Sequence, residues 1–562
     1  MQFKYFRYIF LLVLLLGFGA SAIWAQNQEV TIVAPYKPVI SDAIKKTLTP
    51  QVPETKVEVV PINYSISSEP VYTTYEISAI KPALIEVKTE EEMRRNYLRA
   101  GYGNYNMPYF ELFTNSLSSE DFSIGFHARH LSSKGDIQDY ANSAFSQNQA
   151  SLYVKRYLKE KILSAKIYYD RNVVHYYGFK PDDINDTVSD DDLRQRFSMI
   201  GANLGLTSNK KRDNKLNYDA GLSFYNLSDL YETDELMVGL NSNFNSKDEF
   251  FDFVDKQEMG VDVNFGFYNN KDSLANQSTI VAEIKPYLRW NFEFLDLTVG
   301  VKGAMASDSA AEFYVYPEVQ ASYQVIPKFL RFYASATGGL ERNSFKSVSR
   351  ENPWVNSIFP LGFINTKYKL KGGVTGKASE SIDYNFSVAY ADIENMLFFN
   401  NDFMLSYSPT IAQNFGNKFT GIYDDVLLTT VSLELGYQQS KYFNILLSAN
   451  FKDYQTTTQQ EPWHKPTIEA SLSGKYLFTE KVSFTANLFF NGKTYAQVIE
   501  NGITSIEENK AFVDLNLGLE YHFNDRISAF AQVNNLTSTR YYRWYNYPSQ
   551  RINGMGGFTF SF

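Results

Sequence analysis

The sequence predicts an all-β protein, an antiparallel transmembrane β-barrel of about 22 strands preceded by a short N-terminal extended segment. Three observations support this prediction. From Arg94 to Phe562, segments of roughly ten residues alternate apolar and polar side chains, as strands between lipid and a lumen do. Aromatic residues make up 16% of the chain, which suits aromatic girdles at two membrane interfaces. Mean hydropathy is −0.31, too low for a bundle of membrane helices.

The first 25 residues have the pattern of a secretory signal peptide. Lys4 and Arg7 precede an apolar run from Ile9 to Leu16, and small residues follow at 20–22 and at Ala25. The run is shorter than the roughly 20 residues that a membrane helix needs. With no cysteine, the chain has no disulfide and no residue for a lipid anchor. We therefore expect 1–25 to be removed and the protein to reside in the cell outer membrane.

Residues 26–93 differ in composition from the rest of the chain. They hold seven of the 18 prolines, which remove ladder donors and disfavour regular strands. Short β-prone pieces lie between them, at 57–60 and 85–87. We expect an extended segment that is periplasmic or forms a small plug, and that lies partly inside a barrel built from 94–562.

The segment 512–523 illustrates the alternation that predicts the barrel. Val513, Leu517 and Leu519 share one face, whereas Asp514 and Asn516 share the other. A β-sandwich can also alternate, but it seldom sustains strands this long and this numerous. An even strand count places both ends of the barrel on the periplasmic side.

The connections between the predicted strands alternate between short and long. Short turns are expected near 158–160, 326–328, 438–440, 478–480 and 524–525, and long loops at 131–147, 177–193, 341–365, 394–419, 493–510 and 536–553. Short periplasmic turns and long outer loops are typical of outer-membrane barrels. The stretch 247–257 is an exception, because it is long where a short turn is expected.

The C-terminal sequence AQVNNLTSTRYYRWYNYPSQRINGMGGFTFSF (531–562) resembles the last hairpin of the TonB-dependent receptors. In that family an Asn-Leu pair, here Asn535 and Leu536, precedes a Tyr-rich loop, a proline and a glycine-bearing strand that ends in Phe. The high aromatic content and the sequence GASAIWAQ at the end of the signal peptide are similar to those of family members from Bacteroidetes-type bacteria. The resemblance implies an outer-membrane receptor that takes up a bulky nutrient. Its partners would be outer-membrane lipid, TonB and a surface lipoprotein or another outer-membrane complex.

The chain departs from that family in its plug. Family members carry well over a hundred plug residues, whereas 26–93 provides only 68. The family plug is therefore shortened or missing here. Because a lumen of this width must be filled, either 26–93 forms a reduced plug, or the long loops fold inward, or a partner closes the hole. The sequence EVTIVAP resembles the strand that TonB recruits by strand addition. The resemblance implies that Glu29, Val30, Thr31, Ile32 and Val33 contact TonB. A plug strand or a linker would have the same sequence pattern.

Aromatic residues in the long connections are the candidates for contacting a ligand or partner. Such side chains stack on sugars, anchor protein partners or form the interfacial girdle, and the sequence leaves these alternatives open. The candidates are Trp354, Phe398, Phe399, Trp463, Tyr541, Tyr542, Trp544 and Tyr545.

The remaining chemistry points away from other functions. The net charge of −9 and the lack of a basic stripe argue against a nucleic-acid partner. His127 and His130 are three apart on a predicted strand and so face opposite ways, while His175 and His464 lie in or near loops without nearby partners. No nucleophile or phosphate motif occurs, so we expect no enzyme activity, cofactor or metal. The alternative to uptake is a non-transporting barrel that serves as a scaffold or assembly partner, and a passive porin comes third.

Overall fold

The computed structural model describes residues 95–562, apart from 117–120, 136, 184–187, 210–215, 248–250, 252–255, 309, 403–415, 440–441 and 501–502. The predicted signal peptide, the segment 26–93 and the TonB-contact residues Glu29–Val33 lie outside the described residues. No helix in the described part is long and apolar enough to cross a membrane.

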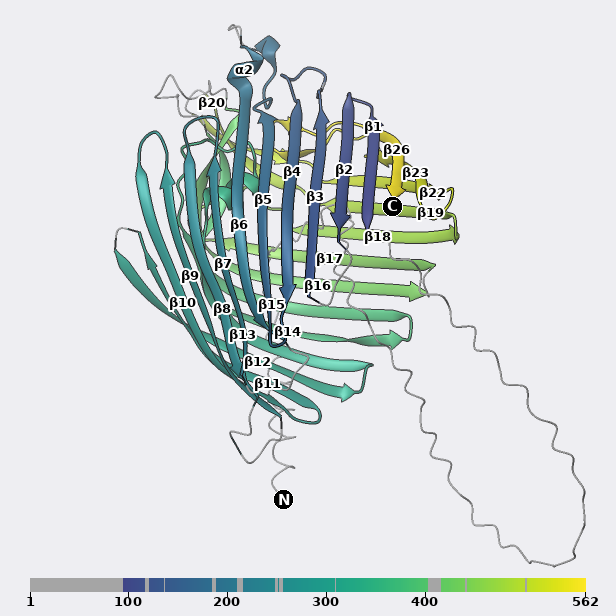
Figure 1. Cartoon of the computed structure of the whole chain (residues 1–562). Coiled ribbons are helices and arrows are strands. Elements are labelled where there is room, and N and C mark those ends of the chain that lie inside the picture. Colours follow the sequence, from purple (N-terminus) through teal and green to yellow (C-terminus); the bar gives the residue numbers. More distant parts are fainter. Residues whose placement is uncertain are drawn as a thin grey trace, which may run out of the picture. The chain divides into compact units, whose positions relative to one another are not determined.

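One sheet of 22 strands forms the molecule's wall (Figure 1). Each strand pairs antiparallel with the next of these 22 in chain order, and the last strand pairs with the first, which closes the barrel. Two further two-stranded sheets lie within connections of the barrel. The closed antiparallel barrel and its count of 22 strands confirm the predicted fold class.

The elements follow one another in a simple order. The barrel strands are β1 (Asn96–Gly103), β2 (Met107–Asn115), β3 (Phe122–Ser133), β4 (Phe145–Tyr157), β5 (Lys161–His175), β6 (Arg194–Ser208), β7 (Leu216–Ser228), β8 (Asp234–Ser246), β9 (Gln257–Lys271), β10 (Asn276–Asn291), β11 (Leu295–Ser307), β12 (Ala311–Ile326), β13 (Leu330–Arg342), β14 (Phe363–Ser379), β15 (Ile382–Asp402), β16 (Lys418–Gln439), β17 (Phe443–Thr456), β18 (Ile468–Thr479), β19 (Val482–Asn491), β22 (Phe512–His522), β23 (Ile527–Asn534) and β26 (Asn553–Ser561). The connections contain η1 (Pro181–Asp183), α2 (Asp190–Leu193), α3 (Phe345–Glu351), β20 (Thr494–Glu500), β21 (Ile503–Asn509), β24 (Tyr542–Trp544) and β25 (Tyr547–Pro548).

The seam between β1 and β26 depends on a glycine. Tyr97 pairs with Ser561 at one end of the seam and Gly103 pairs with Met555 at the other. A Cβ atom at Gly557 would lie 2.1 Å from the backbone oxygen of Ala100, so a larger residue there would push the two strands apart. The glycine-bearing last strand is therefore needed for closure.

The strand faces separate as the alternation predicts. Phe265 on β9 is exposed on the outer surface, as are Leu519 and Tyr521 on β22. Asn264, the neighbour of Phe265, faces inward and hydrogen-bonds Asn241 and Glu283 on adjacent strands. Apolar side chains thus cover the outside of the barrel, where hydrocarbon would solvate them, and polar side chains line the lumen.

The described residues of the long connections lie at one end of the barrel, together with α2 and β20 (Figure 1). They run between strand ends at 134–144, 176–193, 343–362, 403–417, 492–511 and 535–552. At the opposite end, strands are joined by short turns such as 158–160 and 327–329, and β1 begins where β26 ends. The connection 247–256 is again the long exception at that end.

Candidate functional site

The outer connections of the barrel pack on one another across its mouth. We call the cap the described residues of 134–144, 176–193, 229–233, 343–362, 457–467 and 535–552, together with the outer ends of β15 (395–402) and β16 (418–425). A single hydrophobic core of buried residues joins most of these segments. Its members are Ile137, Ala141, Val174, Tyr176, Tyr177, Phe179, Leu193, Phe197, Met199, Tyr225, Leu227, Phe345, Val348, Val355, Phe359, Leu397, Phe399, Phe419, Trp544 and Tyr547.

Hydrogen bonds in the cap join connections that are far apart around the ring. The Tyr176 hydroxyl, between β5 and β6, donates to the Val355 carbonyl, between β13 and β14, at 2.8 Å. The Tyr177 hydroxyl donates to the carbonyl of Pro548, between β23 and β26, at 2.9 Å. Asn417, just before β16, donates from its amide to the Tyr176 carbonyl at 2.6 Å. Because these segments start from widely separated strands, they meet only by crossing the mouth.

Aromatic rings form the centre of the cap. Trp354 stacks on Tyr547 with ring centroids 4.1 Å apart, and Tyr177 meets Tyr547 edge-on at 4.8 Å. Trp544 contacts Phe399 at 5.2 Å and Phe419 at 5.4 Å. Such pairs add to the free energy gained from burying apolar area. The loops are therefore held as a packed core rather than as separate flexible arms.

His464 links its own connection to two other segments of the cap and to β20. Its Nδ1 lies 2.9 Å from the Phe399 carbonyl, and its Nε2 accepts from the Tyr545 backbone N–H at 3.3 Å. Its own backbone N–H donates to Tyr495 on β20 at 2.8 Å. These partners require the neutral imidazole with its proton on Nδ1, and burial lowers the pKa of His464 to about 4. The expectation that His464 lacks nearby partners was wrong.

A buried carboxylate anchors the connection between β7 and β8. Asp229 accepts backbone N–H groups from Tyr231 at 2.8 Å and Thr233 at 2.9 Å, and the Gln195 amide at 3.0 Å. The hydroxyl of Ser357 also donates to Asp229, which ties this connection to the one between β13 and β14. Burial raises the pKa of Asp229, although these hydrogen bonds to the charged form oppose the shift.

Glu235, at the start of β8, holds helix α3 against the wall. Its fully buried carboxylate accepts the backbone N–H groups of Phe345 at 2.6 Å and Lys346 at 3.1 Å, and the Tyr225 hydroxyl at 2.9 Å. These donors include N–H groups of the first turn of α3, which have no partner inside the helix. Sequence reasoning missed Glu235 and Asp229, because the partners that link them to another connection, Phe345 and Ser357, are more than a hundred residues away in the chain.

The structure distributes the eight aromatic candidates over three places. Phe399 and Trp544 belong to the main core of the cap, Trp354 is partly buried and packs against that core, and Tyr545 meets His464 beside it. Phe398 and Trp463 are fully buried in a second core with Tyr454. Tyr541 stacks on Phe512 at 4.0 Å and donates to Asp514, while the hydroxyl of Tyr542 lies 3.3 Å from that of Tyr140. All eight aromatic candidates are buried or partly buried, and they pack mainly against other residues of the protein.

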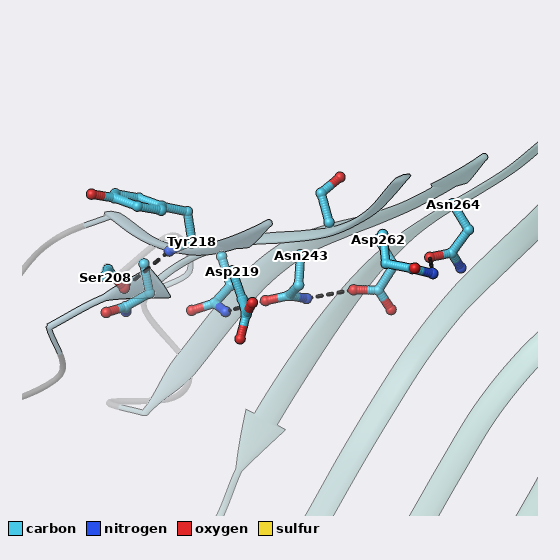
Figure 2. A pocket seen from close by; sticks show the side chains of 10 residues that line it. Ser208, Tyr218, Asp219, Asn243, Asp262 and Asn264 are labelled. Atoms are coloured by element: carbon cyan, nitrogen blue, oxygen red, sulfur yellow. Dashed lines mark hydrogen bonds between the residues drawn. The ribbon is translucent and has the colours of Figure 1, made fainter. Parts of the chain in front are cut away.

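A polar hollow lies on the wall formed by β6 to β9, and Figure 2 shows the side chains that line it. Its volume is about 410 Å³, and amides and carboxylates predominate in its lining. Asn243 donates to Asp262 and to the Tyr287 hydroxyl, the latter at 3.1 Å. Lys285 forms an ion pair with Asp262 at 2.8 Å. The inner wall is thus a hydrogen-bonded polar surface, suited to water or a polar solute.

Within the described residues no group of three or more His, Asp or Glu side chains is placed to hold a metal ion.

Comparison with known proteins finds likeness in structure only. No family model matches the sequence, and no curated protein matches it. The FrpB iron transporter from Neisseria meningitidis matches with a TM-score of 0.64 and 10% identity, over 84% of this chain and 82% of the other. FpvA from Pseudomonas aeruginosa bound to heterologous pyoverdines matches with a TM-score of 0.60 and 13% identity, over 84% and 72%. The ferric-catecholate import receptor Fiu from Escherichia coli K12 matches with a TM-score of 0.62 and 9% identity, over 84% and 82%. At these identities the likeness shows a shared fold.

Proposed function

We propose that this chain, whose barrel shares the fold of FrpB, FpvA and Fiu, is an outer-membrane receptor that takes up a bulky nutrient. FrpB is an iron transporter, FpvA a pyoverdine receptor and Fiu a ferric-catecholate import receptor. Fold alone does not determine function, so the proposal needs support from the site itself.

The observation that carries the proposal is the capped mouth above a wide polar lumen. A barrel of 22 strands is too wide for its own side chains to fill. The cap covers the outer end of this lumen, and polar groups line the wall beneath it. A wide polar passage with a closable outer end suits a solute larger than those that diffuse through open pores. Opening such a cap requires work, which favours an energised receptor over a passive porin.

The energy source in this proposal is TonB, which would act from the periplasm. The proposed contact is Glu29, Val30, Thr31, Ile32 and Val33, whose β-prone sequence would add as a strand to the partner. The segment 26–93 would link this contact to the barrel. A surface lipoprotein that covers the outer loops is a further proposed partner.

One observation favours the alternative of a non-transporting scaffold. Phe398, Phe399 and Trp463 are fully buried, and opening the cap would expose them to water. Burying an aromatic side chain of this size is worth about 1.5–3 kcal/mol. A cap that never opens would keep this gain and leave the barrel available as an attachment surface.

Deleting Glu29–Val33 separates the two functions. Under the receptor proposal, the deletion abolishes growth on the transported nutrient while the amount of folded barrel in the outer membrane stays unchanged. Deleting 66–70 (ISSEP), a stretch of equal length in the same segment, is the matched control and should leave growth intact. If deleting Glu29–Val33 changes nothing under any nutrient limitation, the scaffold function replaces uptake.

A further inference from the structure

Arg342, the last residue of β13, is a buried cation without hydrogen bonds. Its side chain lies under the cap and the residue is 8% exposed. None of its three guanidinium nitrogens has a hydrogen-bond partner in the described structure. Burying a charged group without partners is costly, and proteins usually pair such a group or hydrogen-bond it. The position of Arg342 therefore calls for an explanation.

Aromatic rings flank the guanidinium of Arg342. Its central carbon lies 5.3 Å from the ring centroid of Tyr268 on β9 and 5.6 Å from that of Phe363 on β14. Ring faces stabilise the positive charge of a guanidinium. The rings do not accept hydrogen bonds from the N–H groups as an oxygen atom would. The five N–H donors of the guanidinium therefore have no acceptor.

Glu235, the carboxylate that acts on Arg342, already accepts hydrogen bonds from other groups. Glu235 acts electrostatically on Arg342, but its oxygens accept two backbone N–H groups of α3 and the Tyr225 hydroxyl. The same carboxylate also acts on Lys346, whose Nζ lies 4.0 Å from the Tyr225 ring centroid. Two cations thus share one carboxylate. Arg350, by contrast, has its own partner, Asp170, at 3.2 Å.

We propose that Arg342 binds a compact oxyanion, a carboxylate or phosphate group, beneath the cap. The five N–H donors of a guanidinium match the two oxygens of such a group side by side. Because the closed cap covers Arg342, a small anion reaches it during thermal openings of the cap, which occur without TonB. The inference rests on the proposed function in one respect: it assigns an anionic group to the molecule that enters under the cap. The anion is either that group or a small free ion.

Calorimetric titration of the full chain in detergent micelles tests the proposal. Inorganic phosphate serves as the small free anion and citrate as a larger molecule that carries carboxylates. Arg342→Met should weaken binding of whichever anion the protein holds by at least about tenfold, and Arg342→Lys should weaken it less, because lysine keeps the charge without the fork. Arg350→Met, in the connection that follows β13, is the matched control and should bind as the unmodified chain does. Binding of phosphate supports a free ion, and binding of citrate alone supports a carried group.

A second measurement separates anion binding from a purely structural role. Without added phosphate or citrate, Arg342→Met should unfold at the same temperature as the unmodified chain or higher, because it removes an unpaired buried charge. A lower unfolding temperature would show that Arg342 is needed to balance Glu235 and would overturn the proposal. So would the absence of binding of either anion by the unmodified chain, or equal binding by Arg342→Met. None of these readouts requires TonB or uptake, so they fail independently of the proposed function.

Discussion

At the residue scale, each barrel strand presents neighbouring side chains to opposite surroundings. Phe265 is exposed on the outer surface, and Asn264 beside it hydrogen-bonds across the inner wall. Phe265→Arg should cost about 2–4 kcal/mol if the site lies near the middle of the bilayer. Asn264→Arg should cost little, because Glu283 and Asp262 lie on the inner wall nearby. Heat-dependent mobility in gel electrophoresis measures both, and equal losses would contradict the assignment of the two faces.

His464 makes the cap sensitive to acid. Its pKa in the folded protein is about 4, against an ordinary value of about 6.5, so the folded state binds the proton less readily than the unfolded state. The stability that depends on neutral His464 is full above about pH 6.5 and is lost as the pH falls toward 4. A shift of this size corresponds to roughly 3 kcal/mol.

We therefore expect protease cleavage within the cap to increase between pH 6.5 and pH 4, with the barrel strands still protected. A low fixed amount of an acid-active protease reports the change when its cleavage of the cap is divided, at each pH, by its cleavage of an unfolded substrate. His464→Gln, which has no titrating group, should show a flatter pH dependence. If this variant retains the full pH dependence, another group controls the cap.

The local pattern of residues predicted the strand faces but not the partners of His464. Alternation along one strand is sufficient to assign Phe265 outward and Asn264 inward. The contacts of His464 with Phe399 and Tyr545 join positions 65 and 81 residues apart. Nothing in the residues around His464 indicates such contacts, because they arise only when the connections meet over the mouth.

At the element scale, Glu235 and helix α3 form the clearest link between wall and cap. Glu235→Ala leaves the Phe345 and Lys346 N–H groups and the Tyr225 hydroxyl without an acceptor in a buried place. Hydrogen bonds to charged groups are worth about 1.5–3 kcal/mol. We expect 343–362 to become sensitive to protease while the barrel keeps its resistance to heat. Glu232→Ala, at an exposed position in the neighbouring connection, is the control.

The elements themselves were largely predictable from the sequence. The 22 barrel strands follow the predicted alternation, and five of the six long connections lie within three residues of their predicted bounds. The sixth was expected at 394–419 but spans only 403–417, because β15 extends to Asp402. What the sequence did not indicate is that the connections contain α3 and the small sheets β20–β21 and β24–β25. These elements are short, and their stability depends on packing against other connections rather than on their own residues.

At the scale of the whole molecule, the sequence left open how the lumen is closed. Inward folding of the outer loops was one of three alternatives, and the structure shows it: Tyr176 and Val355, 179 residues apart, meet within the cap. Six of the eight aromatic candidates lie in outer connections, whereas Phe398 and Phe399, expected in a connection, lie on β15, which extends to Asp402. Most of the eight pack into this closure instead of forming an open binding surface. Composition cannot distinguish these roles, because both need large aromatic side chains.

Ion conductance in planar bilayers tests most directly the central claim that the cap closes the barrel. The account predicts that the barrel without 26–93 stays closed, because the cap still covers the outer mouth. Further removal of 344–361 and 536–551, which supply Val355, Phe359, Trp544 and Tyr547 to the core, should produce a large and steady conductance. A large steady conductance from the barrel that lacks only 26–93, with every outer connection intact, would contradict the account.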